Sequence, residues 1–108
     1  RVYSTKMSFD YGALDAALTA AVGDDQLLIA ELRAAFLESA RRQVDLLSRA
    51  RCDANWEYAA WRLKGLAASF SATKILHLAD EAAHSAPGDP VILRKLQRAV
   101  SEVEVHRD

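Results

Sequence analysis

The stretch WEYAAWRLKGLAASF, residues 56–70, has the pattern of an α-helix with one buried face. When each residue turns the helix by about 100°, five apolar side chains fall within about 40° of one line. That side of the helix consists of Trp56, Ala60, Leu63, Ala67 and Phe70. Trp61 points about 140° away from Trp56. The pattern therefore predicts a buried stripe and a second tryptophan on the outer face of the same helix.

The outer face of this segment is unusual because small residues lie beside a large one. Glu57, Lys64, Gly65 and Ala68 are the surface neighbours of Trp61, at spacings that bring side chains together on a helix. A Gly inside a helix costs about 1 kcal/mol relative to Ala, so Gly65 needs a reason. Its direction, about 180° from the buried line, favours open space beside Trp61 over close contact with a neighbouring helix.

Amphipathic helical patterns also cover most of the remaining chain. We expect helices at about 10–21, 24–50, 54–70, 72–86 and from residue 90 onward. The expected end signals are a stop at Gly23, N-caps at Asp24, Asp53, Ser71 and Asp89, and Pro90 at a first helical position.

The expected helices carry apolar stripes with a period near 3.6 residues. In the second helix the stripe is Leu28, Leu32, Ala35, Phe36, Ser39, Leu46, Leu47 and Ala50. In the fourth helix the core line is Ile75, Ala79, Ala82 and Ala86. The last helix carries Val91, Ile92, Leu93, Leu96, Val100 and Val103.

No segment alternates with period two, so the expected fold class is all-α. Short connections between long helices favour an antiparallel up-and-down four-helix bundle, with a short extra helix at the N-terminus. We assign residues 1–9 to a flexible N-terminal segment and residues 10–106 to the bundle.

Composition excludes several classes of partner. The chain has 108 residues and a formal net charge of −1, and its acidic and basic residues are mixed along it. The chain lacks the basic stripe that is typical of nucleic-acid binding proteins. No apolar run approaches the roughly 20 residues that a membrane span needs. No signal peptide pattern opens the chain, and Cys52 is the single cysteine, so a cytoplasmic location is expected.

The residues after Trp61 carry a resemblance to a known family. They are Arg62, Leu63, Lys64 and Gly65. The stretch resembles the histidine-containing phosphotransfer (HPt) domain of two-component phosphorelays. The motif of that family is His, any residue, Leu, Lys, Gly, and a second Gly six residues later. Here Trp61 stands in the His position and Ser71 in the second Gly position. The similarity extends over roughly residues 10–103.

In that family the His is exposed on the side of a four-helix bundle. It accepts a phosphoryl group from an aspartate of one receiver domain and passes it to another. The resemblance implies that Lys64 is the cation near the exchange point and that Gly65 provides clearance. The indole nitrogen of Trp61 carries its hydrogen as a donor only, so this residue is not expected to accept phosphate.

The resemblance thus implies a degenerate HPt-like signalling domain that is not an enzyme. It would dock the receiver domain of a response regulator or hybrid histidine kinase without carrying phosphate. The residues expected to form the docking face are Glu57, Tyr58, Trp61, Arg62, Lys64, Gly65 and Ala68. We expect no catalytic residue, no cofactor, no metal, no nucleic acid and no membrane partner, and a monomer or weak homodimer.

Two other interpretations remain open. The chain could be a helical interaction or dimerisation module that no longer binds receivers, using the patch around Trp61. Less favoured is phosphotransfer through another histidine, of which the chain has His77, His84 and His106. His77, Asp80, Glu81 and His84 also share one helical face, which is typical of solvated ion pairs and only rarely of a metal site.

Overall fold

The computed structural model describes residues 14–105, with side chains described to residue 103. The described chain forms helices at residues 14–22, α2 (Gln26–Arg49), α3 (Asp53–Ser69), α4 (Thr73–Ala83) and α5 (Pro90–Val105). No strand occurs between residues 14 and 105, so the prediction of an all-α fold is confirmed. The predicted flexible segment 1–9, the start of the helix expected from residue 10, and His106 lie outside the described residues.

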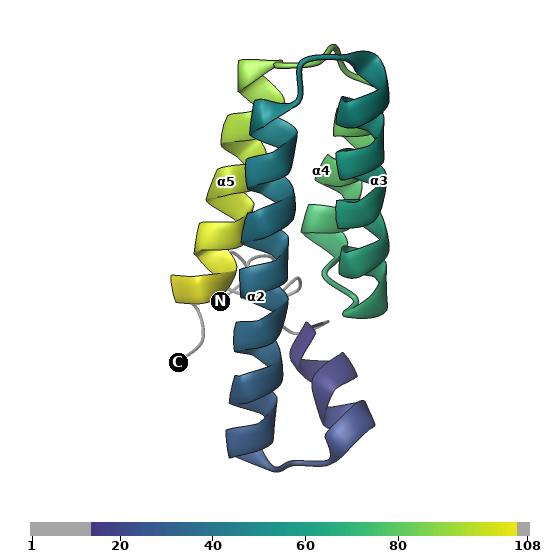
Figure 1. The fold of residues 1–108 in the computed structure, drawn as a ribbon. Helices are drawn as coiled ribbons and strands as arrows, with labels where there is room; N and C mark the ends of the chain where they lie inside the picture. The colour runs from purple at the N-terminus through teal and green to yellow at the C-terminus, as the bar shows by residue number, and fades with distance from the viewer. Residues whose placement is uncertain (1–13, 106–108) are drawn as a thin grey trace, which may run out of the picture.

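The four long helices pack in a ring. α3 lies against both α2 and α4, and α5 closes the arrangement by packing on α2 and α4. In Figure 1 the chain direction reverses at each connection between these helices. α2 is the longest of the described helices, and its N-terminal part extends past the ends of α3 and α4. The helix at residues 14–22 packs beside that extension, where Leu14 and Leu18 are buried.

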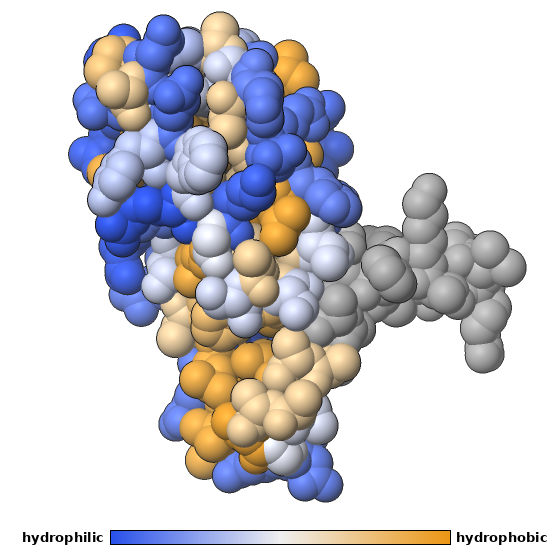
Figure 2. Space-filling view, turned by 90° about the vertical axis from the view of Figure 1, so that its right-hand side faces the viewer, coloured by the Kyte–Doolittle hydropathy of each residue, from blue (hydrophilic) through white to orange (hydrophobic). Residues whose placement is uncertain are grey.

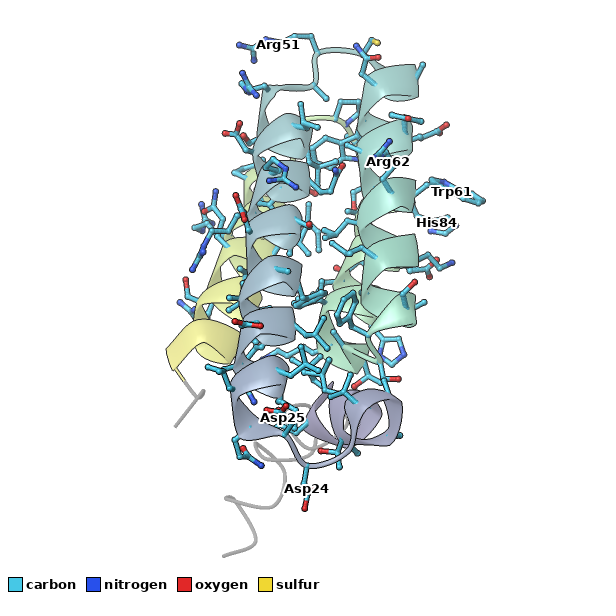
Figure 3. All side chains as sticks on the ribbon, turned by 60° about the horizontal axis from the view of Figure 1, so that its bottom comes forward. Asp24, Asp25, Arg51, Trp61, Arg62 and His84 are labelled. Atoms are coloured by element: carbon cyan, nitrogen blue, oxygen red, sulfur yellow. The ribbon has the colours of Figure 1, made fainter. Side chains whose placement is uncertain are left out.

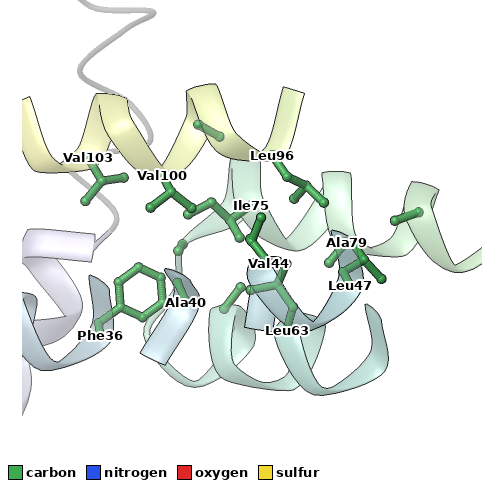
Figure 4. Close-up of a cluster of buried hydrophobic side chains, with 14 of the residues drawn as sticks. Phe36, Ala40, Val44, Leu47, Leu63, Ile75, Ala79, Leu96, Val100 and Val103 are labelled. Carbon is green, nitrogen blue, oxygen red and sulfur yellow. The ribbon is translucent and has the colours of Figure 1, made fainter. Parts of the chain in front are cut away.

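The core draws apolar side chains from every described helix, and Figure 4 shows those contributed by α2 to α5. The stripe predicted for α3 is buried at four of its five positions, and the fifth, Phe70, is half-buried. The Phe70 ring packs against Phe36 of α2, with 5.0 Å between the ring centroids. Trp56 is buried and its indole Nε1–H donates to the Ala82 carbonyl oxygen of α4, with 2.6 Å between the heavy atoms. The inner side of α3, together with Phe70 at its end, therefore contacts both α2 and α4.

The stripe predicted for α2 is partly wrong. Leu28 and Leu46 are 37% and 48% exposed, and Ala35 is exposed. The residues that α2 actually buries are Ile29, Phe36, Leu37, Ala40, Gln43, Val44 and Leu47. The reason is that α2 packs between α3 and α5, so it buries a wide arc whose centre is rotated from the line of leucines. Two further core predictions are wrong. Ala86 lies beyond the end of α4, and Val91 in α5 is 51% exposed.

Two of the predicted helix starts are displaced by one residue. Asp24 does not cap α2, because Asp25 is the N-cap and its Oδ1 accepts the backbone N–H of Leu28 at 3.1 Å. Asp53 is the first residue of α3, whereas the N-cap is Cys52, which makes no side-chain capping bond. Asp53 in the first turn still places a negative charge near the positive end of the helix dipole.

The signals at Gly23 and Asp89 act as predicted. Gly23 has a φ of 79° and its N–H donates to the Thr19 carbonyl oxygen at 2.7 Å, which ends the first helix. Asp89 Oδ1 accepts the backbone N–H of Val91 at 2.9 Å, and Pro90 is the first residue of α5. Proline costs nothing at a first helical position, because its missing N–H would have had no partner within the helix.

The prediction that Ser71 caps α4 is wrong, because Ser71 instead follows the end of α3. Its φ is 56°, in the left-handed region that glycine normally occupies. The Ser71 N–H donates to the Ala68 carbonyl oxygen, and the Ala72 N–H donates to that of Ala67. These two bonds form the Schellman arrangement that closes a helix. The residue before α4 is Ala72, which makes no side-chain capping bond.

Candidate docking surface on helix α3

The candidate docking face lies on the outer side of α3 and consists of Glu57, Tyr58, Trp61, Arg62, Lys64, Gly65 and Ala68. Six of these residues are exposed and Lys64 is half-buried. Trp61 is 65% exposed and Tyr58 is 63% exposed, although both rings are large enough to form core. Figure 3 shows Trp61 projecting from α3 away from the other helices. The outward direction predicted for this tryptophan is therefore confirmed.

Gly65 opens a space beside Trp61. A Cβ atom built on Gly65 would meet no atom within 4 Å outside its own helix backbone. No neighbouring helix therefore requires a glycine at this position, and its backbone is helical rather than left-handed. The glycine costs helix stability without any return from packing inside the described chain.

Lys64 connects the docking face to α4. Its Nζ donates a hydrogen bond to Asp80 Oδ1 at 2.8 Å, and it lies 5.8 Å from the centroid of the Trp61 ring. The hydrogen bond and the positive charge of Lys64 lower the pKa of Asp80 below its ordinary value of 3.8. Asp80 is therefore ionised at neutral pH, and the lysine ammonium has an anionic partner on α4.

The second aromatic side chain of the face is also held by a cation. Arg62 Nη1 donates to the Tyr58 hydroxyl oxygen at 3.0 Å, and its guanidinium carbon is 5.6 Å from the centroid of the Tyr58 ring. Both aromatic rings thus have a basic partner three or four residues later on the helix. Such contacts lower the rotamer freedom of the rings before any partner arrives.

The described histidines lie on α4, or at its end, and not on the docking face. His77 and His84 are both exposed, as the helical pattern predicts. The His84 Nδ1 lies 2.8 Å from the Asp80 carbonyl oxygen, and because a carbonyl only accepts, Nδ1 carries the hydrogen in this contact. Figure 3 shows His84 on the same side of the molecule as Trp61.

The four polar residues considered as a metal face do not form one. Within residues 14–105 no group of three or more His, Cys, Asp or Glu side chains is arranged to hold a metal ion. Asp80 is bonded to Lys64 instead, and Glu81 lies 3.8 Å from the Lys95 ammonium of α5. The acidic residues of this face therefore serve contacts between helices.

The sequence pattern missed two surface features. One is the ion pair between Lys64 and Asp80, because residues on different helices carry no spacing signal that links them. The other is an apolar surface where helix 14–22 meets the start of α2, seen as the orange area at one end of Figure 2. Leu27, which is 72% exposed, and Leu28 belong to the start of α2.

Comparisons with known proteins give no assignment, since no family model, no curated protein and no solved structure matches the chain. Within the described residues no helix is both long enough and apolar enough to cross a membrane.

Proposed function

We propose that this chain is a degenerate HPt-like domain that docks receiver domains of phosphorelay proteins without accepting phosphate. The proposal includes the arrangement of α2 to α5 as an antiparallel four-helix bundle, the scaffold that the resemblance implies. The protein acts as a binding module in the cytoplasm and not as an enzyme. It occupies the surface of a receiver that a true phosphotransfer protein would use. It therefore competes with that phosphotransfer protein or holds the receiver in a complex.

The observation that carries the proposal is the exposure of Trp61 beside the open space at Gly65. Water is a poor environment for an indole, and a glycine weakens a helix, so an isolated domain gains nothing from either. Both become useful when a partner packs on α3, because the indole then buries a large area and the glycine allows close approach. Trp, Tyr and Arg are also the residue types most enriched among binding hot spots, and the face holds one of each.

The chemistry of position 61 supports docking without phosphate transfer. Phosphoryl transfer to a side chain requires a nucleophile with an available lone pair, and the indole nitrogen has none. The motif lysine is present in Lys64, but its ammonium is bonded to Asp80 rather than open to an incoming phosphoryl group. In this proposal the docking face on α3 still contacts a partner, but it lacks the histidine that would accept the phosphoryl group.

A pull-down from lysate tests the docking face directly. Wild type and Trp61→Ala are compared, and Leu27→Ala serves as the matched control, because Leu27 is also large, apolar and exposed but lies on α2. We expect wild type and Leu27→Ala to retain a protein that contains a receiver domain, and Trp61→Ala to lose it. Retention of the same receiver by Trp61→Ala would contradict the proposed face.

The correspondence between Trp61 and the phosphate-accepting His has its own test. Wild type and Trp61→His are incubated with the captured receiver after its aspartate has been phosphorylated with a radioactive label. Label on Trp61→His, and none on wild type, is the expected outcome. Label on wild type would instead indicate transfer to another histidine, for which the exposed His77 and His84 are the described candidates.

The second candidate function is self-association or binding of an unrelated protein. The same exposed rings of Trp61 and Tyr58 favour it, because a helical face with a large anchor and an adjacent space can pair with its own copy. Sedimentation with and without receiver domains separates the two functions. A dimer that dissociates on Trp61→Ala and ignores receivers would favour this second candidate.

A further inference from the structure

We infer that the α3 face selects the unphosphorylated state of its receiver partner. This inference rests on the proposed function, because it concerns which form of the receiver the same face binds. It follows from the charges around Trp61, and above all from the ion pair that engages Lys64.

A phosphorylated receiver brings additional negative charge to the surface that contacts position 61. A phosphate group carries about 1.5 to 2 negative charges at neutral pH and binds well only where cations or N–H donors are available. Lys64 is a basic residue beside Trp61, with its ammonium 5.8 Å from the ring centroid. The same ammonium donates to Asp80 Oδ1 at 2.8 Å, so part of its charge is already offset within the protein.

The other charged side chains of α3 near Trp61 do not replace that cation. Glu57 is exposed one turn before Trp61 and adds a negative charge to the face. Arg62 follows Trp61 directly, and consecutive residues of a helix point in different directions. Its guanidinium is bonded to the Tyr58 hydroxyl. The faces of the indole π-system are electronegative, so they attract the Lys64 ammonium and not an anion.

An incoming phosphoryl group would therefore meet an indole, a carboxylate from Asp80 and an engaged lysine. An unphosphorylated receiver has only its aspartate at this place, and the indole can pack against the surrounding apolar surface. The negative charge of the phosphoryl group weakens binding only modestly, because interactions between exposed charges are small at physiological ionic strength. We expect a preference of about fivefold for the unphosphorylated state, measured as a ratio of dissociation constants.

Isothermal titration with the captured receiver domain tests this inference. The receiver is used alone and after treatment with beryllofluoride, which forms a stable mimic of the aspartyl phosphate. Wild type is expected to bind the untreated form about fivefold more tightly. Equal binding, or tighter binding of the treated form, would overturn the inference and leave the docking function intact. Absence of binding to either form would overturn both.

Two variants identify the ion pair as the cause of the preference. Asp80→Asn removes the anionic partner of Lys64 and should abolish or reverse the preference. Glu81→Gln removes one negative charge from the same helix, but Glu81 pairs with Lys95, so this variant should keep the wild-type ratio. If both variants change the ratio equally, general charge and not the release of Lys64 is responsible, and the inference is wrong.

A double variant excludes a purely structural effect of Asp80. Asp80→Asn combined with Lys64→Gln lacks the ammonium that the single change releases. We expect this double variant to bind the treated receiver more weakly than Asp80→Asn does. If the two bind it equally, Lys64 does not contact the phosphate mimic and the inference fails.

Discussion

Replacement of Gly65 by alanine should stabilise the protein and weaken its docking. Gly65 lies inside α3, four residues before the helix ends at Ser69, and an added Cβ would meet no atom within 4 Å. Without a steric penalty, the change in the free energy of unfolding is the difference in helix propensity, about 0.8–1 kcal/mol in favour of Ala. For a domain of this size that corresponds to an increase in Tm of about 4–8 °C, measured by circular dichroism during heating.

The matched control is Ala35→Gly, because Ala35 is exposed in the middle of α2. It should lower the free energy of unfolding by a similar amount, and it should leave receiver binding unchanged. Gly65→Ala should instead weaken receiver binding by about tenfold, the usual scale of an added methyl group in a close-packed contact. An unchanged or lowered Tm for Gly65→Ala would show that position 65 is not open, and full receiver affinity would show that its space is not used.

Three further predictions concern stability. Ser71→Gly should raise the free energy of unfolding by about 0.5–1 kcal/mol, because glycine adopts a positive φ without strain; thermal unfolding checks this, with Ser71→Ala expected to bring no gain. Trp56→Phe should cost about 1–3 kcal/mol through the lost hydrogen bond to Ala82 and the smaller ring, seen as a lower urea midpoint at unchanged slope. The pKa of Asp80 is lowered by Lys64, so the stability from this pair is complete well above pH 3.8 and is lost as the pH falls below that value. Unfolding of wild type and Asp80→Asn should therefore differ at neutral pH and converge in strong acid, whereas a constant difference would exclude this titration.

The two faces of α3 could be predicted from sequence because its polar and apolar residues separate clearly around the helix. The large side chains of Trp56 and Leu63 leave one possible buried line, and the structure follows it. α2 has apolar residues around more of its circumference, so periodicity alone gives several possible lines. The 3.6-residue period puts Leu28 and Leu46 on the buried stripe, but neighbours on two sides of α2 select a different arc.

Helix starts were predicted less well than helix centres. Asp24 and Asp25 are chemically equivalent N-caps, and only the backbone of the folded chain selects Asp25. The same limit applies to Ser71, a good N-cap by residue type that lies one position too early and has a left-handed backbone.

The candidate docking face followed from spacing within one helix, and so its exposure could be predicted. The electrostatic state of this face could not be predicted, because Asp80 lies 16 residues after Lys64 in the chain and reaches it from another helix. A basic residue in a motif suggests an available cation, and only the packing of α4 on α3 shows that this one is already engaged.

The two tryptophans of the chain have opposite environments within a single helix, and this provides two optical probes without labelling. Trp56 is 1% exposed and hydrogen-bonded, so its fluorescence reports whether the interior is intact. Trp61 is 65% exposed, so its emission and its access to a soluble quencher report what covers the outside of α3. One sample can therefore distinguish a partner that covers the surface from one that unfolds the protein.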